Sequence, residues 1–508
     1  MKMKRKLKIA ALALTTIGFL SACGNNQTTE AKKDTDELSV VTTFYPVYEF
    51  TKNIVGDEGE VKLLIPAGTE AHDYEPSAKD VAGISEADVF VYHNENLETW
   101  VPQILTTFGE DAPNILKGTQ DVILLPGDEE HEEEAENEDH QHALDPHTWL
   151  APSLAIEEVT SISQQLMALY PEKKAVFEAN TEKYLAELTA LDAKYQSAFA
   201  NPEQTNFVTQ HAAFGYLAAE YGLKQIPIAG LSADQEPSPA RIAELKDYVE
   251  ANQIHYIYFE ENANDKIAKT LASEVKVELV ELSTLESLSK KEIDTGVNYI
   301  SVMEENLLAL QKTTNTTGKE IQPEDEDSEK TVANGYFEDQ KVKDRALADY
   351  AGQWQSVYPL LKAGDLDQVF AYKAKINQDM TAEEYKAYYD QGYQTEVDEL
   401  VITDKTIDFV IAGEHHKYTY DYQGYEILTY EKGNRGVRFT FKAQEEAASD
   451  FKYVQFSDHN IAPVKAEHFH IFVGGESQAA LYEEMHNWPT YFPSDLSGQE
   501  VAQEMMSH

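Results

Sequence analysis

The sequence predicts two folded units of different class: an α/β unit with parallel sheets, followed by an α+β unit built on an antiparallel β-barrel. In the first unit, short apolar runs alternate with amphipathic stretches, and most runs are continuously apolar, as in parallel strands covered on both faces. In the second unit, apolar residues recur with a period of two, and turn residues separate the segments. The 508 residues are enough for two or three domains.

The amino end predicts an export signal. Five basic residues precede an apolar run over residues 9–20, which is too short to span a bilayer. Small residues and Cys23 follow, and this end resembles the bacterial lipobox, in which the cysteine is lipidated and becomes the first residue. We therefore expect a lipoprotein signal peptide over residues 1–22 and a polar tether over residues 23–37. The alternative is a leader that ends in a cysteine by chance.

The cysteine count and the charge limit the ligands and partners of the chain. Cys23 is the only cysteine, so no disulfide forms within the chain, and any metal must be held by nitrogen and oxygen. The sequence has 41 basic and 90 acidic residues, a net charge of −49, and about −54 without the leader. Such a surface repels nucleic acid and concentrates cations. Because 42% of the residues are hydrophobic, the chain is not a disordered polyanion.

In the first unit, over residues 38–311, apolar runs predict the strands and one long amphipathic run predicts a linking helix. The helix should extend from Glu172 to Phe199, directly after Pro171, and measure about 40 Å, enough to tie two lobes together. The expected strands are residues 38–44, 61–66, 87–93, 206–211, 254–260 and 276–282.

In the second unit, over residues 334–508, the alternating segments predict a small barrel with helices at one end. The preceding residues 312–333 are almost free of apolar side chains and contain Pro and Gly, which predicts a linker. Helices are expected around residues 346–361 and 381–393. The expected strands are residues 405–413, 416–433, 436–443, 452–458 and 467–475.

Three histidines of the first unit lie where a strand passes into a helix. His72 precedes a helix that Ser77 and Asp80 can cap, His147 lies between two prolines, and His211 ends a strand. In open α/β sheets, ligands bind at such loops, and a helix amino terminus favours neutral imidazole. Taken separately, each histidine also fits a loop or capping role, and the spacings of 75 and 64 residues do not join them.

The first unit contains five motifs of a known family: TFYPVYEFTKNIVGD, PAGTEAHDYEPSAKD, LDPHTWLAP, FVTQHAAFGYLAAEYGL and IYFEENANDKIAKTLASE. Through these motifs, residues 38–311 resemble the zinc-specific substrate-binding proteins of bacterial ABC transporters, a cluster that includes manganese receptors and the ZnuA type. The resemblance implies two α/β lobes joined by a rigid helix, with the metal held between the lobes by three histidines and a carboxylate or water. It places the histidine ligands at His72, His147 and His211.

For the fourth ligand, the resemblance points to LVELSTLESLS, where Glu286 is the preferred candidate and Glu281 the competitor. A structural alternative is a capping box, in which Ser283 and Glu286 begin a helix. Three nitrogens and one carboxylate would complete a tetrahedral shell that suits Zn²⁺. Manganese relatives replace one histidine by a carboxylate, so zinc is favoured and a manganese receptor remains the alternative.

The second unit contains another group of histidines. His468 and His470 are two apart on an expected strand, so both rings should project from one face and Phe469 from the other. A hairpin would fold His459 towards this pair. The alternative is a chance surface feature, but three converging imidazoles would be costly to leave protonated side by side.

The second unit also contains motifs of a known family: LADYAGQWQSVYPLLKAGDLDQVF, HFHIFVGG and MHNWPTYFPSDLSGQEVAQEMMSH. Through these motifs, residues 334–508 resemble the ZinT family of exported zinc- and cadmium-binding proteins, which have a calycin- or lipocalin-like barrel. The resemblance implies metal ligands at His459, His468 and His470, with water or an incoming donor in the fourth position. Four further histidines are candidates for assistance or for solvated surface positions: His415, His416, His486 and His508.

The run DEEHEEEAENEDHQH, residues 128–142, contains nine carboxylates and three imidazoles. It has no apolar side chains larger than alanine to bury, so it cannot fix a coordination geometry by itself. Receptors of the ZnuA cluster carry a His-rich acidic insertion at this place before the second histidine ligand. We interpret the run as an antenna in which His131, His140 and His142 capture zinc weakly.

Both halves, behind a lipobox, resemble the two-domain zinc-binding lipoproteins of Gram-positive bacteria. The resemblance implies a monomer on the outer side of the cell membrane, anchored through Cys23, that captures Zn²⁺ at two sites and delivers it to an ABC permease. No enzymatic activity is expected. A zinc hydrolase is the alternative from another class, but no general base accompanies the second-unit histidines. An adhesin or a carrier of apolar ligands is a third reading.

Overall fold

The computed structural model describes residues 38–109, 112–127, 144–231, 239–260, 266–317, 332, 335–429, 435–482 and 487–506. Six residues singled out in the sequence lie outside these ranges: Cys23, His131, His140, His142, His486 and His508. Within the described part of the chain, no helix combines the length and apolarity that a membrane crossing requires.

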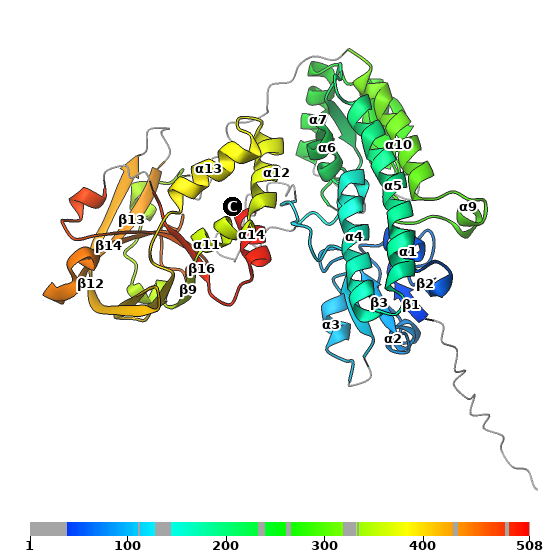
Figure 1. Ribbon diagram of the computed structural model, residues 1–508. Coiled ribbons are helices and arrows are strands. Elements are labelled where there is room, and N and C mark those ends of the chain that lie inside the picture. Colours follow the sequence, from blue (N-terminus) through cyan, green and yellow to red (C-terminus); the bar gives the residue numbers. More distant parts are fainter. Residues whose placement is uncertain are drawn as a thin grey trace, which may run out of the picture. The chain divides into compact units, whose positions relative to one another are not determined.

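The first lobe is a parallel four-stranded sheet of order β2-β1-β3-β4 (Figure 1). Its central strands are the most apolar, and all four residues of β3 are buried. The parallel arrangement that the continuous apolar runs predict is therefore confirmed. The strands are β1 (Leu38–Thr42), β2 (Gly59–Leu63), β3 (Val89–Tyr92) and β4 (Asn114–Lys117), and the helices are α1 (Tyr45–Val55), α2 (Ala78–Ser85), α3 (Val101–Leu105) and α4 (Pro152–Leu169).

The second lobe repeats this plan with a parallel sheet of order β6-β5-β7-β8. The central strand β5 is fully buried, whereas the edge strands β6 and β8 each leave residues exposed. Its strands are β5 (Asn206–Thr209), β6 (Lys224–Pro227), β7 (Tyr256–Phe259) and β8 (Glu278–Glu281), and its helices are α6 (Gly215–Tyr221), α7 (Pro239–Ala251), α8 (Lys266–Val275), α9 (Lys290–Asp294) and α10 (Tyr299–Thr314).

The long helix α5 (Lys174–Ala198) has 25 residues and joins the two lobes. It packs against α1 and α4 of the first lobe and α10 of the second (Figure 1). Phe177, Leu188 and Tyr195 lie fully buried along it, in an apolar core shared by both lobes. The predicted linking helix is therefore present, and it packs against both lobes.

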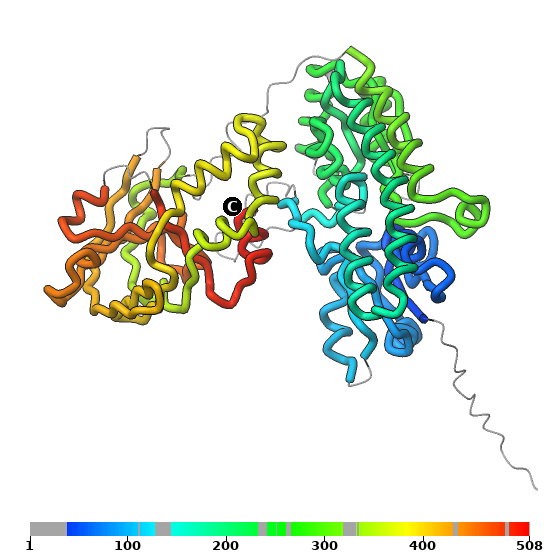
Figure 2. Tube along the Cα trace, in the orientation of Figure 1, coloured from blue at the N-terminus to red at the C-terminus, as the bar shows by residue number. Residues whose placement is uncertain are grey.

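The second unit is a closed antiparallel barrel of order β10-β11-β12-β13-β14-β15-β16-β9 (Figure 2). Stacked and edge-to-face aromatic rings fill it, among them Tyr350, Phe456 and Phe469. The strands are β9 (Gly352–Ser356), β10 (Glu399–Ile402), β11 (Thr406–Ile411), β12 (Glu414–Thr429), β13 (Arg435–Ala443), β14 (Tyr453–Ser457), β15 (Phe469–Gly474) and β16 (Thr490–Pro493), and the helices are α11 (Val357–Ala363), α12 (Asp367–Asn377), α13 (Ala382–Gly392) and α14 (Gly498–Met506).

The expected helix over residues 346–361 is wrong in its middle. The chain forms a short 3-10 helix over Leu347–Tyr350, then β9, and only the last part is α-helical, as α11. Trp354 points into the barrel core, while its neighbours in the strand are more exposed, which is a period of two. Because β9 pairs with both β10 and β16 and closes the barrel, its state depends on partners distant in sequence.

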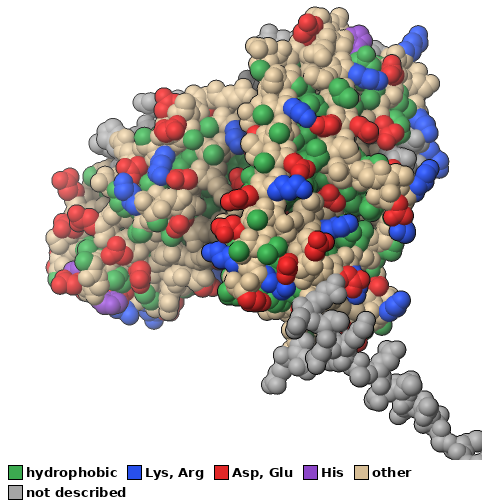
Figure 3. Space-filling view, turned by 45° about the vertical axis from the view of Figure 1, so that its right-hand side comes forward, with side chains coloured by type: hydrophobic (Ala, Val, Ile, Leu, Met, Phe, Trp, Pro, Cys, Tyr) green, Lys and Arg blue, Asp and Glu red, His purple; other side chains and the backbone are tan. Residues whose placement is uncertain are grey.

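The surface of the molecule carries both signs of charge despite the acidic composition. Figure 3 shows acidic and basic side chains mixed over one face, with no large basic patch on that face.

Candidate metal centres

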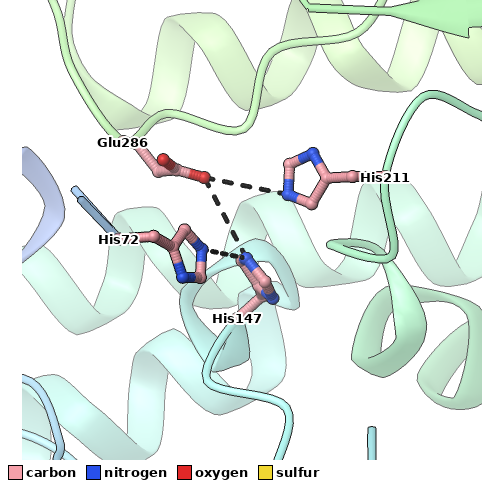
Figure 4. Close-up of side chains that lie close together, drawn as sticks. All are labelled: His72, His147, His211 and Glu286. Atoms are coloured by element: carbon pink, nitrogen blue, oxygen red, sulfur yellow. Dashed lines mark hydrogen bonds and ion pairs between the residues drawn. The ribbon is translucent and has the colours of Figure 1, made fainter. Parts of the chain in front are cut away.

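Four side chains from four separate loops converge between the lobes of the α/β unit (Figure 4). One ligand atom from each of them lies within 4.8 Å of all the others. Nε2 of His72 lies 3.1 Å from Nε2 of His147, and Oε1 of Glu286 lies 4.0 Å from His147 Nε2 and 3.9 Å from His211 Nε2. These four residues, hereafter the cleft set, can surround one ion.

The strand-to-helix loops place the cleft set. His72 follows β2, His211 follows β5 and Glu286 follows β8, each at the carboxyl end of a parallel strand. Downstream of His72, Ser77 caps α2 in a capping box with Asp80, as the sequence predicts.

Two carboxylates pair with the Nδ1 atoms of two cleft histidines, on the side of each ring away from the cleft. Asp145 Oδ1 lies 2.7 Å from His147 Nδ1 and also accepts the backbone N–H of His147 at 2.9 Å. Glu260 Oε1 lies 2.5 Å from His211 Nδ1. A histidine ligand whose other nitrogen donates to a carboxylate presents a lone pair on Nε2 and has a fixed ring orientation. Both carboxylates were missed in the sequence, although Asp145 is two residues before His147 and Glu260 ends an expected strand.

A buried polar network fixes the loop that carries His147. His93 Nε2 lies 2.6 Å from the carbonyl of Pro146, and Thr148 donates to Glu158 at 2.6 Å. Burial opposes the charged form of His93, but Glu158, Glu98 and the carbonyl of Pro146 together raise the pKa of His93. The loop therefore has little freedom to move the His147 ring.

Burial and neighbouring charges set the protonation of the cleft set. Burial, together with the other two histidines, lowers the pKa of His72 to about 3, and burial also lowers the pKa of His147 well below its usual value. Both rings are therefore neutral and ready to coordinate. The expectation of a neutral ring does not hold for His211: burial opposes its charged form, but Glu260, Glu70 and Asp145 together raise its pKa. Burial and the hydrogen-bonded Glu70 raise the pKa of Glu286.

The backbone conformation places the Glu286 side chain in the cleft, and Glu286 does not cap a helix. The residue before it, Leu285, has a left-handed backbone with φ +58°, which is uncommon for a non-glycine residue and points to a functional constraint. The capping-box alternative for Glu286 is wrong, because the next helix, α9, begins after Ser289 and is capped by Ser289 and Glu292. Glu281 is exposed at the end of β8 and is not in the cleft set.

The donor atoms of the cleft set lack other partners. His211 Nε2 and Glu286 Oε1 are buried and make no hydrogen bond within the described structure. Three imidazole nitrogens and one carboxylate oxygen form a donor set that suits tetrahedral Zn²⁺. A cavity of about 590 Å³ adjoins the set, and Glu70, Glu260 and Glu286 are among the residues that line it.

The barrel brings His459, His468 and His470 together at one end of the β14–β15 hairpin. Their ring centroids lie 5.4 to 6.1 Å apart, within the 5.1 to 6.4 Å range of the cleft histidines. Phe469 is buried in the barrel core, so the expected alternation of Phe469 against the two histidines is confirmed. The nitrogen atoms of these three rings converge less tightly than the ligand atoms of the cleft set. Among the described residues, the cleft set is the one group whose ligand atoms all lie within 4.8 Å of one another.

Neighbouring side chains orient two of these rings and favour the neutral form of His470. His470 Nδ1 lies 2.8 Å from the hydroxyl of Thr490, and the His468 ring stacks on Phe492. Burial, His459 and Arg438 lower the pKa of His470 well below its usual value. His459 has a left-handed backbone with φ +63° and an exposed side chain, which leaves one ring accessible at the mouth of the hairpin.

His415 and His416 have other neighbours. His415 Nδ1 lies 3.1 Å from Asp408, and the His416 ring stacks on Phe451. Both lie at the start of β12, whereas the three barrel histidines border β14 and β15. The two histidines therefore lie on the β11–β12 hairpin, apart from the three barrel histidines.

Each of the two units matches a known protein family. Residues 40–313 match the family model described as zinc-uptake complex component A, periplasmic, and residues 328–508 match the model described as ZinT (YodA), periplasmic lipocalin-like zinc-recruitment. The zinc-binding lipoprotein AdcA of Streptococcus pneumoniae is 56% identical over 506 residues, 99% of this chain and 100% of the relative. The chain belongs to the AdcA family.

Other members of the AdcA family match over nearly the same length. The zinc-binding protein AdcA of Streptococcus pyogenes serotype M3 is 52% identical and covers 95% of this chain and 96% of its own. A crystal structure of Zn(II)-bound AdcA from Streptococcus pneumoniae is 57% identical, with a TM-score of 0.84, and covers 93% of this chain and 100% of that chain. The AdcA family thus has both predicted fold classes in one chain, the parallel two-lobed unit and the antiparallel barrel.

Proposed function

We propose that this chain is a zinc receptor that captures Zn²⁺ outside the cell and delivers it to an ABC permease in the membrane. The observation that carries the proposal is the cleft set, in which three imidazoles and Glu286 face one point and two of the rings are held by carboxylates. The chain binds its metal as cargo and performs no catalysis. The zinc named in the AdcA relatives agrees with this donor set.

The cleft set is the transport site in this proposal. Four protein ligands contributed by both lobes favour retention of the ion while the lobes stay together. Movement of one lobe away from the other would separate His72 and His147 from His211 and Glu286, and this separation would release the ion at the permease.

Metal analysis of the purified chain tests the proposal. We expect two Zn²⁺ per chain, and one after His72, His147 and His211 are all replaced by alanine. Replacement of His415 and His416, which lie outside both candidate centres, is the matched control and should leave two. One zinc or none in the unaltered chain, or tighter binding of Mn²⁺ than of Zn²⁺ in competition, would contradict the proposal.

The barrel histidines His459, His468 and His470 form the second site, with a position open to water or to an incoming donor. Such a site suits acquisition of zinc when the metal is scarce. The triple alanine variant should keep one zinc per chain by calorimetry and should support poorer growth under zinc limitation. Unimpaired growth at every zinc concentration would contradict this role.

The anchor and the acidic run complete the proposal. Lipidation of Cys23 would hold a monomeric receptor on the extracellular face of the cell membrane, next to its permease. Residues 128–142 would raise the local zinc concentration beside the cleft through His131, His140 and His142. The lipobox sequence and the position of the run before His147 support these two assignments.

A further inference from the structure

The barrel unit contacts the α/β unit through residues 121–125, hereafter the docking segment, which follow β4. Ile123, Leu124 and Leu125 are buried, and they share one apolar cluster with side chains of α11, α12 and α14. This cluster joins residues that are more than 200 positions apart in the sequence. The contact therefore belongs to the packed core and is not a loose surface contact.

Two glutamine side chains of the barrel unit satisfy the backbone of the docking segment. Gln503 of α14 accepts the N–H of Leu124 at 2.7 Å and donates to the carbonyl of Leu124 at 2.8 Å. Gln368 of α12 accepts the N–H of Ile123 at 3.3 Å and donates to the carbonyl of Asp121 at 3.0 Å. A carboxamide pairs with a peptide group as a neighbouring strand would, so side chains of the second unit satisfy these exposed and partly buried backbone groups.

The docking segment leads directly to the cleft. The N–H of Leu125 donates to the hydroxyl of Tyr216 at 2.8 Å, and this hydroxyl donates to the carbonyl of Asp145 at 2.7 Å. The N–H of Asp145 returns a hydrogen bond to the carbonyl of Leu125 at 2.9 Å. Asp145 is the carboxylate that holds Nδ1 of His147. Tyr216 is fully buried, and burial raises its pKa, so its hydroxyl keeps the proton that it donates.

We infer that Gln368, Gln503 and Tyr216 are positioning residues for His147, and that docking of the barrel unit thereby tightens zinc binding in the cleft. The inference rests on the proposed role of His147 as a ligand. Carboxylates that orient a histidine ligand affect metal affinity about 10- to 100-fold, so a relay that places such a carboxylate acts on the same quantity. The barrel unit then aids zinc retention even when its own three histidines carry no metal.

The test uses the full chain with His459, His468 and His470 replaced by alanine, so that only cleft zinc is measured. In this parent, Gln368→Leu with Gln503→Leu should speed zinc release to a chelator about 5- to 20-fold. Tyr216→Phe keeps the ring packing and removes only the hydroxyl, and it should speed release about 3- to 10-fold. Gln499→Leu, on the same helix as Gln503, is the matched control and should change nothing.

Two further measurements separate positioning from general loosening. In the Asp145→Asn background the glutamine substitutions should have little further effect, because the group that they position is already altered. The visible absorption of the Co²⁺-loaded chain should also change in the glutamine variant and not in Gln499→Leu, because it reports ligand geometry. Zinc release within twofold of the parent, or a full additive effect on Asp145→Asn, overturns the inference. A parent that binds no zinc contradicts the proposed function instead.

Discussion

At the scale of single residues, the cleft depends on side chains that do not face the metal position. The histidines could be predicted from the sequence because each lies in a loop at a strand end and in a motif of a known family. Asp145 and Glu260 could not, because the partner of a histidine's second nitrogen depends on which loops meet in the folded chain. Asp145 reaches its histidine two residues away, whereas Glu260 reaches His211 from another strand.

Glu260 offers a direct test at this scale. Glu260→Gln replaces the carboxylate on Nδ1 of His211 by a neutral amide, so His211 becomes a weaker and less firmly oriented ligand. We expect the dissociation constant for cleft zinc to rise about 10- to 100-fold, measured by competition with a chelator. The control is Glu274→Gln, since Glu274 forms an exposed ion pair with Lys246 at 3.7 Å. Equal affinities of the two variants would show that Glu260 does not orient the ligand.

At the scale of elements, a buried ion pair anchors the loop between β14 and β15. Arg345 binds both carboxylate oxygens of Asp458, at 2.5 and 2.6 Å, and donates to the carbonyl of Val464 at 2.6 Å. Its side chain and that of Asp458 are almost completely buried. Asp458 directly precedes His459, so this pair holds the loop that carries one of the barrel histidines.

Arg345→Met should therefore affect both stability and the barrel site. It leaves Asp458 buried without a partner for its charge, which costs about 3–5 kcal/mol in the free energy of unfolding of this unit. Denaturant unfolding measures the loss, and calorimetry should show weaker zinc binding at the barrel with the cleft unchanged. Lys362→Met, at an exposed ion pair with Asp390, is the control and should leave the unfolding midpoint where it is. Equal stability of the two variants would contradict the anchoring role.

Several elements that escaped prediction are short edge or closing strands. β4, β6 and β16 have four residues each, and β16 contains Pro493. Length alone does not explain the difference, since β3 and β5 are equally short, but all residues of β3 and β5 are buried, whereas β4 and β6 each leave residues exposed. The missed strands gain their state from pairing with predictable strands such as β3, β5 and β15. The buried central strands and the long helix α5 could be predicted because their own side chains form the core.

At the scale of the whole molecule, the change of period between the units predicts two architectures, but it says nothing of their contact. In the sequence, the docking segment is only a short apolar run after an edge strand. Its hydrogen-bond partners, Gln368 and Gln503, are polar residues on amphipathic helices. A contact of this kind depends on the complementary shapes of the two units and on backbone groups that need a hydrogen-bond partner. The pattern of residues along the sequence shows neither. The histidines of both candidate sites can therefore be proposed from the sequence, whereas the contact between the units becomes visible only in the folded chain.

Zinc at each site should stabilise mainly the unit that provides its ligands, with a smaller effect on the other unit through the docking segment. Free Zn²⁺ at roughly 100 times the dissociation constant of a site adds about 2.7 kcal/mol to the unit that binds it. Since a chain of two units need not unfold in one step, calorimetric melting should show zinc-dependent shifts of two transitions. The alanine variant of His72, His147 and His211 should lose one shift, and the variant of His459, His468 and His470 the other. Mg²⁺, which prefers six oxygen ligands, should shift neither transition. Loss of both shifts in a single triple variant would mean that the two sites are not independent in binding.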